Sequence, residues 1–352
     1  MVNRTTIGLD IGTTHVRAVE LETKGARRAQ EAPTVRAYGE VPLPPGAVRD
    51  GEVAEHETVV QAVKELWGRS KFTGKEVVIG VGNQRVFTRE MSLPWLPADQ
   101  LRSSLPYHAQ DALPMSVDEV LMDFVPVEEL QGEGGRTVQG LFVAAQRDTV
   151  NAGVLAAQGA GLKVRAVDLN ALALLRSLLR GQPAGQTVAV IDVGARVTNL
   201  SIATDGRPRL ARTIASGGAD VTDAVARSRG ITGPEAEQLK QQLGVGFQAP
   251  TGYEDVADAI LSTARGLVEA IQGTLSYFQR SNPQHGLSGV LLSGGGAHLP
   301  GLGQYLASSV RLPVGLGDPL AGIRVAGTGI DKLSTPPSAL ALVLGLAQGD
   351  HA

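Results

Sequence analysis

A short motif that occurs twice places the strongest constraint on this 352-residue chain, once around Asp10 and again around Asp192. Each copy has an apolar strand, an Asp, an apolar residue, a Gly and a second strand, in Ile7–Gly12 and Val190–Gly194. A glycine two residues after the Asp lets the turn approach a ligand closely, with amides that can donate hydrogen bonds. One copy alone is equally typical of a tight turn, whereas two matching copies favour a duplicated fold with a ligand between its halves.

The residues around the two aspartates fit a polyphosphate. Thr13 and Thr14 add hydroxyl donors after the first glycine. An Asp at each strand end can hold a hydrated divalent cation, because Mg²⁺ usually keeps several of its waters. We therefore expect two hairpins, one from each half, to hold a polyphosphate and its cation from both sides.

A third glycine cluster, Ser293–Gly296, lies between a predicted buried strand and a predicted helix. Glycines at this position permit close approach of a flat or phosphorylated ligand to the backbone. The cluster is not a dinucleotide-binding fingerprint, because Leu299 stands where the third glycine would be needed, and the chain has no GxxxxGK[ST] loop. The alternative is a strand-to-helix connection that needs left-handed residues, which accounts for one or two glycines better than for three.

Glu237 and Lys240 are three residues apart on a helix predicted over 235–243. Residues at this spacing are neighbours on a helix surface. Taken alone, the pair is more typical of a solvated surface contact than of a ligand site.

Composition excludes several classes of site. The chain has no cysteine, which rules out disulfides, cysteine-bound metal centres and thiol nucleophiles. Six histidines without an HxxxH arrangement do not indicate a histidine metal site. A net charge of −3 gives no overall attraction to nucleic acid or to an anionic membrane. No signal peptide and no apolar run of about 20 residues is present, so we expect a cytoplasmic protein.

Hydrophobic periodicity predicts alternating strands and helices, with an inserted block over 85–161 of strand, helix, strand, strand and helix. The helix predicted over 98–113 is interrupted by Pro106. The other predicted helices cover 57–69, 148–160, 171–180, 235–243, 255–279, 300–309 and a last segment from Pro336 or Pro337 to Leu346. The predicted strands cover 6–9, 16–21, 35–41, 76–82, 85–93, 120–127, 137–145, 163–167, 188–191, 197–202 and 289–292.

The three glycine-containing turns stand in the order of the phosphate-1, phosphate-2 and adenosine motifs of the actin/Hsp70/sugar-kinase ATPase superfamily, and the match spans nearly the whole chain. Within it, GLDIGTTHVRAVEL, AVIDVGARVTNLSI and LLSGGGAHLPGLGQYLA resemble the FtsA/PilM family, most of all the PilM proteins of type IV pilus assembly. The resemblance implies an α/β actin-like ATPase fold, with duplicated RNase H-like lobes and an FtsA-type 1C subdomain insertion. It also implies ATP and Mg²⁺ between the lobes.

The same resemblance implies a division of the chain into subdomains. Lobe 1 (1A) would take residues 1–84 and, with the interdomain helix, 162–186, while 85–161 would form the inserted 1C subdomain. Lobe 2 (2A) would take 187–218 and 287–335. Residues 219–286 would form a helical 2B subdomain, and 336–352 a C-terminal helix returning to lobe 1.

Site residues follow from the resemblance position by position. Asp10 and Asp192 would be the metal-side carboxylates, holding Mg²⁺ through water. The other implied contacts fall into three groups: phosphate donors at Gly12, Thr13, Thr14 and Gly194; adenosine-lining glycines at Gly294, Gly295 and Gly296; and ribose and adenine contacts at Glu237 and Lys240. Asp168 or Asn170 would orient a water for hydrolysis or, equally, cap a helix.

Two positions depart from the family pattern. Arg17 stands where the family usually has a lysine on the phosphates, and a guanidinium fork differs from a point-charge ammonium. Arg196 occupies a phosphate-2 position that a small residue often fills, where it would either contact the γ-phosphate or crowd it. Together they favour nucleotide binding over hydrolysis, which would be slow.

The resemblance implies a cytoplasmic assembly protein recruited to the inner face of the membrane. Its partners would be the N-terminal cytoplasmic tail of a PilN-like membrane protein, captured near the 1A/1C region, and other pilus assembly proteins. It implies no nucleic-acid partner and only indirect contact with the membrane. It leaves open whether the protein self-associates and whether it serves a related secretion system. The alternatives are a small-molecule kinase of the superfamily, an FtsA-like division protein and a scaffold that binds no nucleotide. For an FtsA-like protein we expect a membrane-targeting helix after the last predicted helix.

Overall fold

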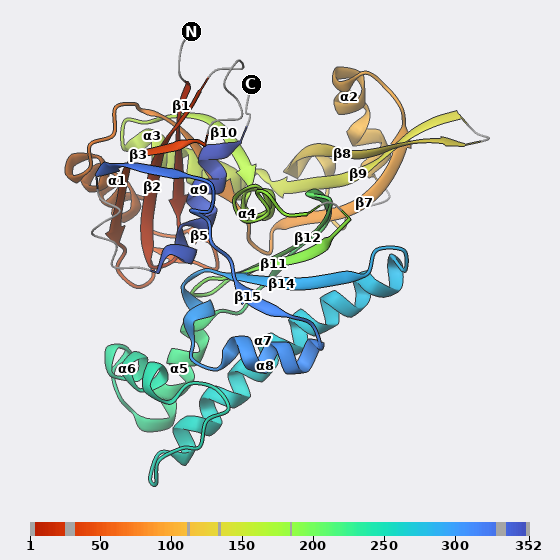
Figure 1. Cartoon of the computed structure of the whole chain (residues 1–352). Helices are drawn as coiled ribbons and strands as arrows, with labels where there is room; N and C mark the ends of the chain where they lie inside the picture. Colours follow the sequence, from red (N-terminus) through yellow and green to blue (C-terminus); the bar gives the residue numbers. More distant parts are fainter. Residues whose placement is uncertain are drawn as a thin grey trace.

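The computed structural model describes residues 4–24, 32–110, 113–132, 135–183, 185–328 and 336–349. The described chain forms two lobes, each built on a mixed sheet, with a three-stranded subdomain that extends to one side (Figure 1). The expected α/β architecture is confirmed. The predicted subdomain boundaries stay predictions, and the last three residues of the C-terminal segment lie outside the described residues.

The first lobe contains a six-stranded sheet in the order β10-β6-β1-β2-β3-β16. Its strands are β1 (Arg4–Ile11), β2 (His15–Thr23), β3 (Thr34–Pro42), β6 (Glu76–Val81), β10 (Lys163–Leu169) and β16 (Arg324–Thr328). A two-stranded ribbon, β4 (Val48–Arg49) and β5 (Glu52–Val53), lies in the predicted proline-rich loop.

The second lobe repeats this topology, with the order β13-β12-β11-β14-β15 matching β3-β2-β1-β6-β10. Its strands are β11 (Thr187–Val193), β12 (Thr198–Thr204), β13 (Arg207–Ile214), β14 (Leu287–Ser293) and β15 (Val314–Leu316). The register repeats as well, because Asp10 pairs with Arg17 and Asp192 with Asn199, each seven residues on. The duplication read from the sequence is confirmed.

Two helices lie between the sheets of the lobes, α4 (Asn170–Leu178) and α9 (Ala341–Gln348) (Figure 1). Every residue of α9 from Ala341 to Ala347 is buried, as expected for a helix that is apolar on all sides. A Cβ on Gly345 would lie 1.9 Å from the carbonyl oxygen of Ala173, so the helices cross at a glycine. The short 3₁₀ turn Pro337–Leu340 leads into α9.

Helices α1 (His56–Arg69) and α3 (Arg147–Gly159) cover the other face of the first sheet. Ala156 and Ala157 of α3 join the hydrophobic core around α1, so α3 packs with the first lobe although it ends the inserted block of the sequence.

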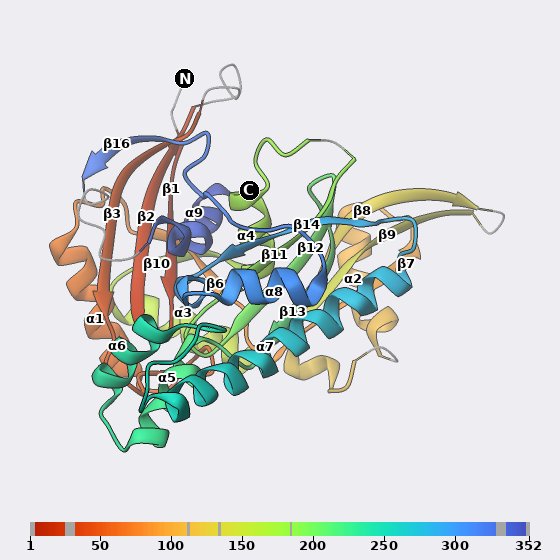
Figure 2. The same ribbon diagram turned by 60° about the horizontal axis from the view of Figure 1, so that its bottom comes forward.

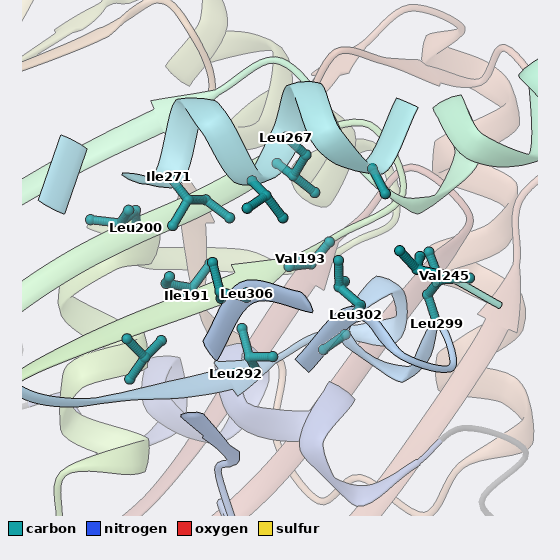
Figure 3. Close-up of a cluster of buried hydrophobic side chains, with 14 of the residues drawn as sticks. Ile191, Val193, Leu200, Val245, Leu267, Ile271, Leu292, Leu299, Leu302 and Leu306 are labelled. Atoms are coloured by element: carbon teal, nitrogen blue, oxygen red, sulfur yellow. The ribbon is translucent and has the colours of Figure 1, made fainter. Parts of the chain in front are cut away.

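The outer face of the second sheet carries α5 (Gly218–Arg229), α6 (Gly233–Leu243), α7 (Glu254–Ser281) and α8 (Leu302–Val310). Ile191 and Leu200 of the sheet pack against Leu267 and Ile271 of α7 and Leu306 of α8 (Figure 3). The long helix α7 runs beneath the sheet towards the inserted subdomain (Figure 2).

The inserted subdomain has a sheet in the order β7-β9-β8, covered by α2. Its elements are β7 (Val86–Pro94), α2 (Ala98–Ala109), the 3₁₀ turn Val117–Glu119, β8 (Val120–Gly132) and β9 (Gly135–Gln146). The prediction that Pro106 interrupts the helix is wrong, because α2 continues through it. Pro106 is exposed, so water can replace the bond that the carbonyl of Arg102 loses.

The subdomain is anchored to the edge strand β13 of the second lobe. The Thr88 hydroxyl donates to the carbonyl of Ala211, and Arg207 Nη1 donates to the carbonyl of Val127 at 3.0 Å. An insertion in the first half of the chain therefore contacts the second lobe directly. Within the described ranges, no helix has both the length and the apolar composition needed to span a membrane.

Candidate functional site

A cavity of about 690 Å³ lies between the two lobes, where the paired hairpins face each other. It brings together every predicted site residue except Asp168: Asp10, Gly12, Thr13, Thr14, Arg17, Asn170, Asp192, Gly194, Glu237, Lys240, Gly294, Gly295 and Gly296. These residues come from five separate segments of the chain, so their convergence is a property of the fold.

The two hairpin turns are closed by the same hydrogen bond. The Gly12 amide donates to the carbonyl of His15, and the Gly194 amide to that of Val197, each at 3.0 Å. A Cβ on Gly12 would lie 3.0 Å from the His15 oxygen, and one on Gly194 2.7 Å from the Val197 oxygen, so the close approach requires glycine. The two glycine amides are therefore engaged in the turns and are not the free donors that the motif suggests.

Amides at the tip of the first turn can take the donor role instead. Within the described part of the chain, no backbone carbonyl accepts a hydrogen bond from the amide of Thr13 or Thr14. The Thr14 hydroxyl contacts His15 Nδ1 at 3.0 Å.

Asp10 and Asp192 both lie in a setting where burial disfavours the charged carboxylate. Burial raises the pKa of Asp10, and the charge of Arg17 opposes this rise. Burial raises the pKa of Asp192 to about 6; the hydrogen bond from Ser293 opposes the rise and the charge of Asp10 adds to it. A bound cation would relieve this concentrated negative charge, so the pair fits a divalent metal.

The pair alone would not enclose a metal ion. Among the residues that the structure describes, no group of three or more His, Asp or Glu side chains could hold one. A cation here would complete its shell with water and with oxygens of a bound ligand, which is how Mg²⁺ is commonly held beside phosphates.

The two arginines that depart from the family pattern differ in position. Arg17 lines the cavity, and its Nε lies 3.3 Å from a carboxylate oxygen of Glu40. Arg196 turns away onto α5, where it pairs with Asp220 at 2.7 Å and with Asp223 at 2.6 Å. Arg196 is not among the cavity-lining residues although its partner Asp223 is, and its predicted contact with, or crowding of, a γ-phosphate stays a prediction.

Glu237 and Lys240 are part of the cavity wall, which argues against a solvated surface pair. Lys240 is only 5% exposed, and its Nζ donates to Glu237 at 2.6 Å, to the Thr222 hydroxyl at 3.0 Å and to the carbonyl of Gly218 at 3.2 Å. Hydrogen bonds from Gln241, Lys240 and Thr222 lower the pKa of Glu237 against the opposing effect of burial. The carboxylate is thus fixed and charged at the wall.

The three glycines after β14 have different roles. Gly294 has φ 83°, and a Cβ there would lie 2.4 Å from the carbonyl oxygen of Val193. A Cβ on Gly296 would lie 2.6 Å from Val193 Cγ1, whereas one on Gly295 would meet nothing within 4 Å. Gly294 and Gly296 are required by packing against β11, and Gly295 leaves open space in the cavity wall.

Neither Asp168 nor Asn170 caps α4, whose N-cap is Leu169 without a side-chain hydrogen bond. Asp168 pairs with Arg176 and does not line the cavity. Asn170 does line it, packed against Gly80 and Gly82, and its buried Oδ1 has no hydrogen-bond partner among the described residues. Of the two alternatives, only Asn170 is placed to contact a ligand.

Several lining residues were missed by the sequence analysis, among them His15, Asn199, Gly218 and Thr222. Asn199 is the counterpart of Arg17 in the repeat, so the seven-residue offset from the Asp could have identified it. Burial and the charge of Arg17 lower the pKa of His15, so this side chain is neutral at physiological pH.

A second cavity, of about 480 Å³, lies where α4, the subdomain strand β8 and the turn before β13 meet. Leu172, Leu175 and Leu179 form its apolar wall together with Val125. Gln348 also lines it, and both polar atoms of its amide are buried without a hydrogen-bond partner in the described ranges. Arg176 and Arg180 line it too, so the cavity has an apolar wall with polar and cationic groups beside it.

Comparisons with known proteins cover nearly the whole chain. The model of the family described as "Type IV pilus assembly protein PilM" matches residues 8–349. A solved PilM–PilN type IV pilus biogenesis complex matches at 26% identity and a TM-score of 0.82, over 97% of this chain and 97% of that one.

More distant matches share the fold alone. MreB5 of Spiroplasma citri bound to AMPPNP is 15% identical with a TM-score of 0.54, over 97% of this chain and 94% of that one. By sequence, cell division protein FtsA of Bacillus subtilis (strain 168) is 18% identical in an alignment of 340 residues that covers 85% of this chain and 75% of FtsA.

Proposed function

This chain belongs to the family of type IV pilus assembly proteins described as PilM, and on that premise we propose that it is an ATP-binding scaffold that captures a PilN-like partner. The proposal rests above all on the interlobe cavity, in which both Asp hairpins, the Glu237–Lys240 pair and the glycine turn after β14 converge. The weaker similarity to FtsA supports the same fold.

Each end of the cavity suits a different part of Mg²⁺–ATP. The tip amides and hydroxyls of Thr13 and Thr14 face the phosphates, with Arg17 as the nearby cation. Asp10 and Asp192 hold the hydrated metal, which neutralises phosphate charge when bound. Glu237 and Lys240 would contact the ribose and adenine, as the family resemblance implies, and they are held at the wall formed by α6. Gly294 to Gly296 border the same space.

Hydrolysis is at most slow in this proposal. Asn170 is the lining residue placed to orient a water, and an amide cannot accept the proton of that water as a carboxylate would. Arg17 is engaged by Glu40, and Arg196 by Asp220 and Asp223. The nucleotide would then act by stabilising one arrangement of the lobes.

The partner site in this proposal is the cavity between α4 and β8, which lies where the first lobe meets the inserted subdomain. Its leucine wall suits an apolar tail segment, and the Gln348 amide suits a peptide backbone. Capture of a membrane protein's cytoplasmic tail would bring the chain to the inner face of the membrane.

The test measures two affinities separately: Mg²⁺–ATP, and a synthetic N-terminal tail peptide of the PilN-like protein of the same host. We expect Asp10→Asn to lose ATP affinity and keep the peptide, and Val125→Glu to lose the peptide and keep ATP. Leu121→Glu is the matched control, since Leu121 lies on the same strand and is 40% exposed. If the wild-type protein does not bind ATP, the nucleotide proposal is refuted. If it does not bind the tail peptide, the partner proposal is refuted.

A further inference from the structure

A third cavity, of about 580 Å³, lies between the inserted subdomain and the second lobe, away from both sites described above. Residues 84–90 form one side, residues 209–213 of β13 form another, and the end of α7 closes it with Tyr277 and Asn282. No residue that lines this cavity also lines the nucleotide cavity or the cavity of the proposed tail site.

The lining of this third cavity carries an excess of positive charge. Arg89, Arg209 and Arg212 all border it, against one carboxylate, Glu90. Arg209 is 9% exposed and shared between Glu90 at 3.9 Å and Glu128 at 3.3 Å, while its buried Nε has no hydrogen-bond partner within the described residues. The charge of Arg209 is therefore balanced by two carboxylates, and only its Nε is left without a hydrogen bond.

The other two arginines of the lining have no carboxylate partner among the described residues. Arg89 and Arg212 are exposed, and neither forms an ion pair in the part of the chain that the structure describes. Arg212 Nη1 only donates to the Thr274 hydroxyl, at 3.3 Å. Exposed cations around a concave, low-dielectric wall attract an anionic ligand.

The backbone around the cavity can also bind an extended chain. β7 is the edge strand of the three-stranded sheet and β13 the edge strand of the five-stranded sheet. No backbone hydrogen bond joins β7 to β13 among the described residues; the Thr88 hydroxyl donates to the carbonyl of Ala211 instead. An unpaired strand edge is a site where an extended peptide can add by backbone hydrogen bonds.

We propose that this cavity docks an acidic, extended segment of a protein partner, whose carboxylates meet the exposed Arg89 and Arg212 while its backbone lies along the edge of β7. Tyr277, which is 56% exposed at the rim, supplies apolar contact for a side chain of the segment. This surface is independent of nucleotide and of the tail site. It would let the protein hold a second partner at the junction of the subdomain and the second lobe.

The probe is a fluorescent peptide that alternates Val and Glu, compared with one that alternates Val and Lys. The double variant Arg89→Glu/Arg212→Glu should lose at least about tenfold in affinity for the Val-Glu peptide, because it reverses the charges of both exposed arginines. Arg227→Glu/Arg265→Glu is the control with the same change in net charge; both residues are exposed on α5 and α7 and line none of the three cavities.

Hydrogen exchange should also slow in β7 when the Val-Glu peptide binds. Equal binding of both peptides, unchanged affinity in the double variant, no binding at all, or an RNA oligonucleotide binding here in place of the peptide would each overturn the proposal. ATP and tail-peptide affinities of the double variant should stay at the wild-type value, which separates this result from a failure of the proposed function.

Discussion

Replacing Asp192 by Asn should raise the free energy of unfolding at alkaline pH. This gain in stability should shrink as the pH falls. Asp192 is 8% exposed, and burial with the nearby charge of Asp10 raises its pKa to about 6. An unfolded Asp titrates near about 4, and each tenfold change in proton affinity equals about 1.4 kcal/mol. The ionised carboxyl therefore costs the folded state about 3 kcal/mol above pH 6.

The sign of the pH dependence follows from the raised pKa. The full cost applies above the folded-state pKa of about 6. As the pH falls from this pKa towards the pKa of an unfolded Asp, the folded state takes up a proton and the cost disappears. An Asn has no charge to bury, and its amide can donate towards Asp10. The gain from Asp192→Asn should be about 2–3 kcal/mol near pH 8 and close to zero near pH 4.

Urea unfolding at these two pH values measures the difference. Asp258→Asn is the control, since Asp258 is exposed on α7 and its replacement should change the free energy of unfolding by less than about 0.5 kcal/mol. In Asp192→Asn, the affinity for Mg²⁺–ATP should also fall about tenfold or more, because a metal-side charge is lost. A loss of stability at pH 8, or an equal gain at both pH values, would refute the reasoning.

Three further changes test other parts of the structure. Lys240→Met should weaken ATP binding about tenfold or more, since it removes a charge-assisted hydrogen bond to Glu237, and titration calorimetry would measure it. Gly345→Ala should cost about 1–3 kcal/mol in chemical unfolding, because main-chain atoms block the new methyl, whereas Gly68→Ala, with nothing within 4 Å, should be neutral or slightly stabilising. Pro106→Ala should stabilise α2 by about 1–3 kcal/mol in thermal unfolding, and a loss would contradict our account of its exposed face.

The elements that could be predicted are those whose local pattern agrees with their environment. The two Asp hairpins and the turn after β14 were found because glycine is needed there for backbone approach, which the sequence displays directly. The Glu237–Lys240 pair could be placed on a helix, but only the fold shows that Lys240 is buried against Thr222.

The strand β13 shows why other parts could not be predicted. Its sequence carries Arg207, Pro208, Arg209 and Arg212, which is not typical of a buried strand, and it was not predicted. It forms a strand by pairing with β12, and the inserted subdomain supplies a carbonyl to Arg207 and a carboxylate to Arg209. Asp168 likewise pairs with Arg176, a contact that spacing alone did not identify. Tertiary contacts decided both cases.

The position of α9 has a consequence for how the protein is made. One core cluster of the first lobe packs Val19 and Leu21 of β2 against Leu344 of α9, so this cluster can form only after α9 has been synthesised. The second lobe's main core lies wholly between Ala189 and Leu306. The first lobe's other core cluster lies between Ile7 and Leu162 and contains no residue of α9. Since domains generally fold as units during synthesis, both of these cores can form before α9 is made, and α9 then packs between the lobes as the last core element.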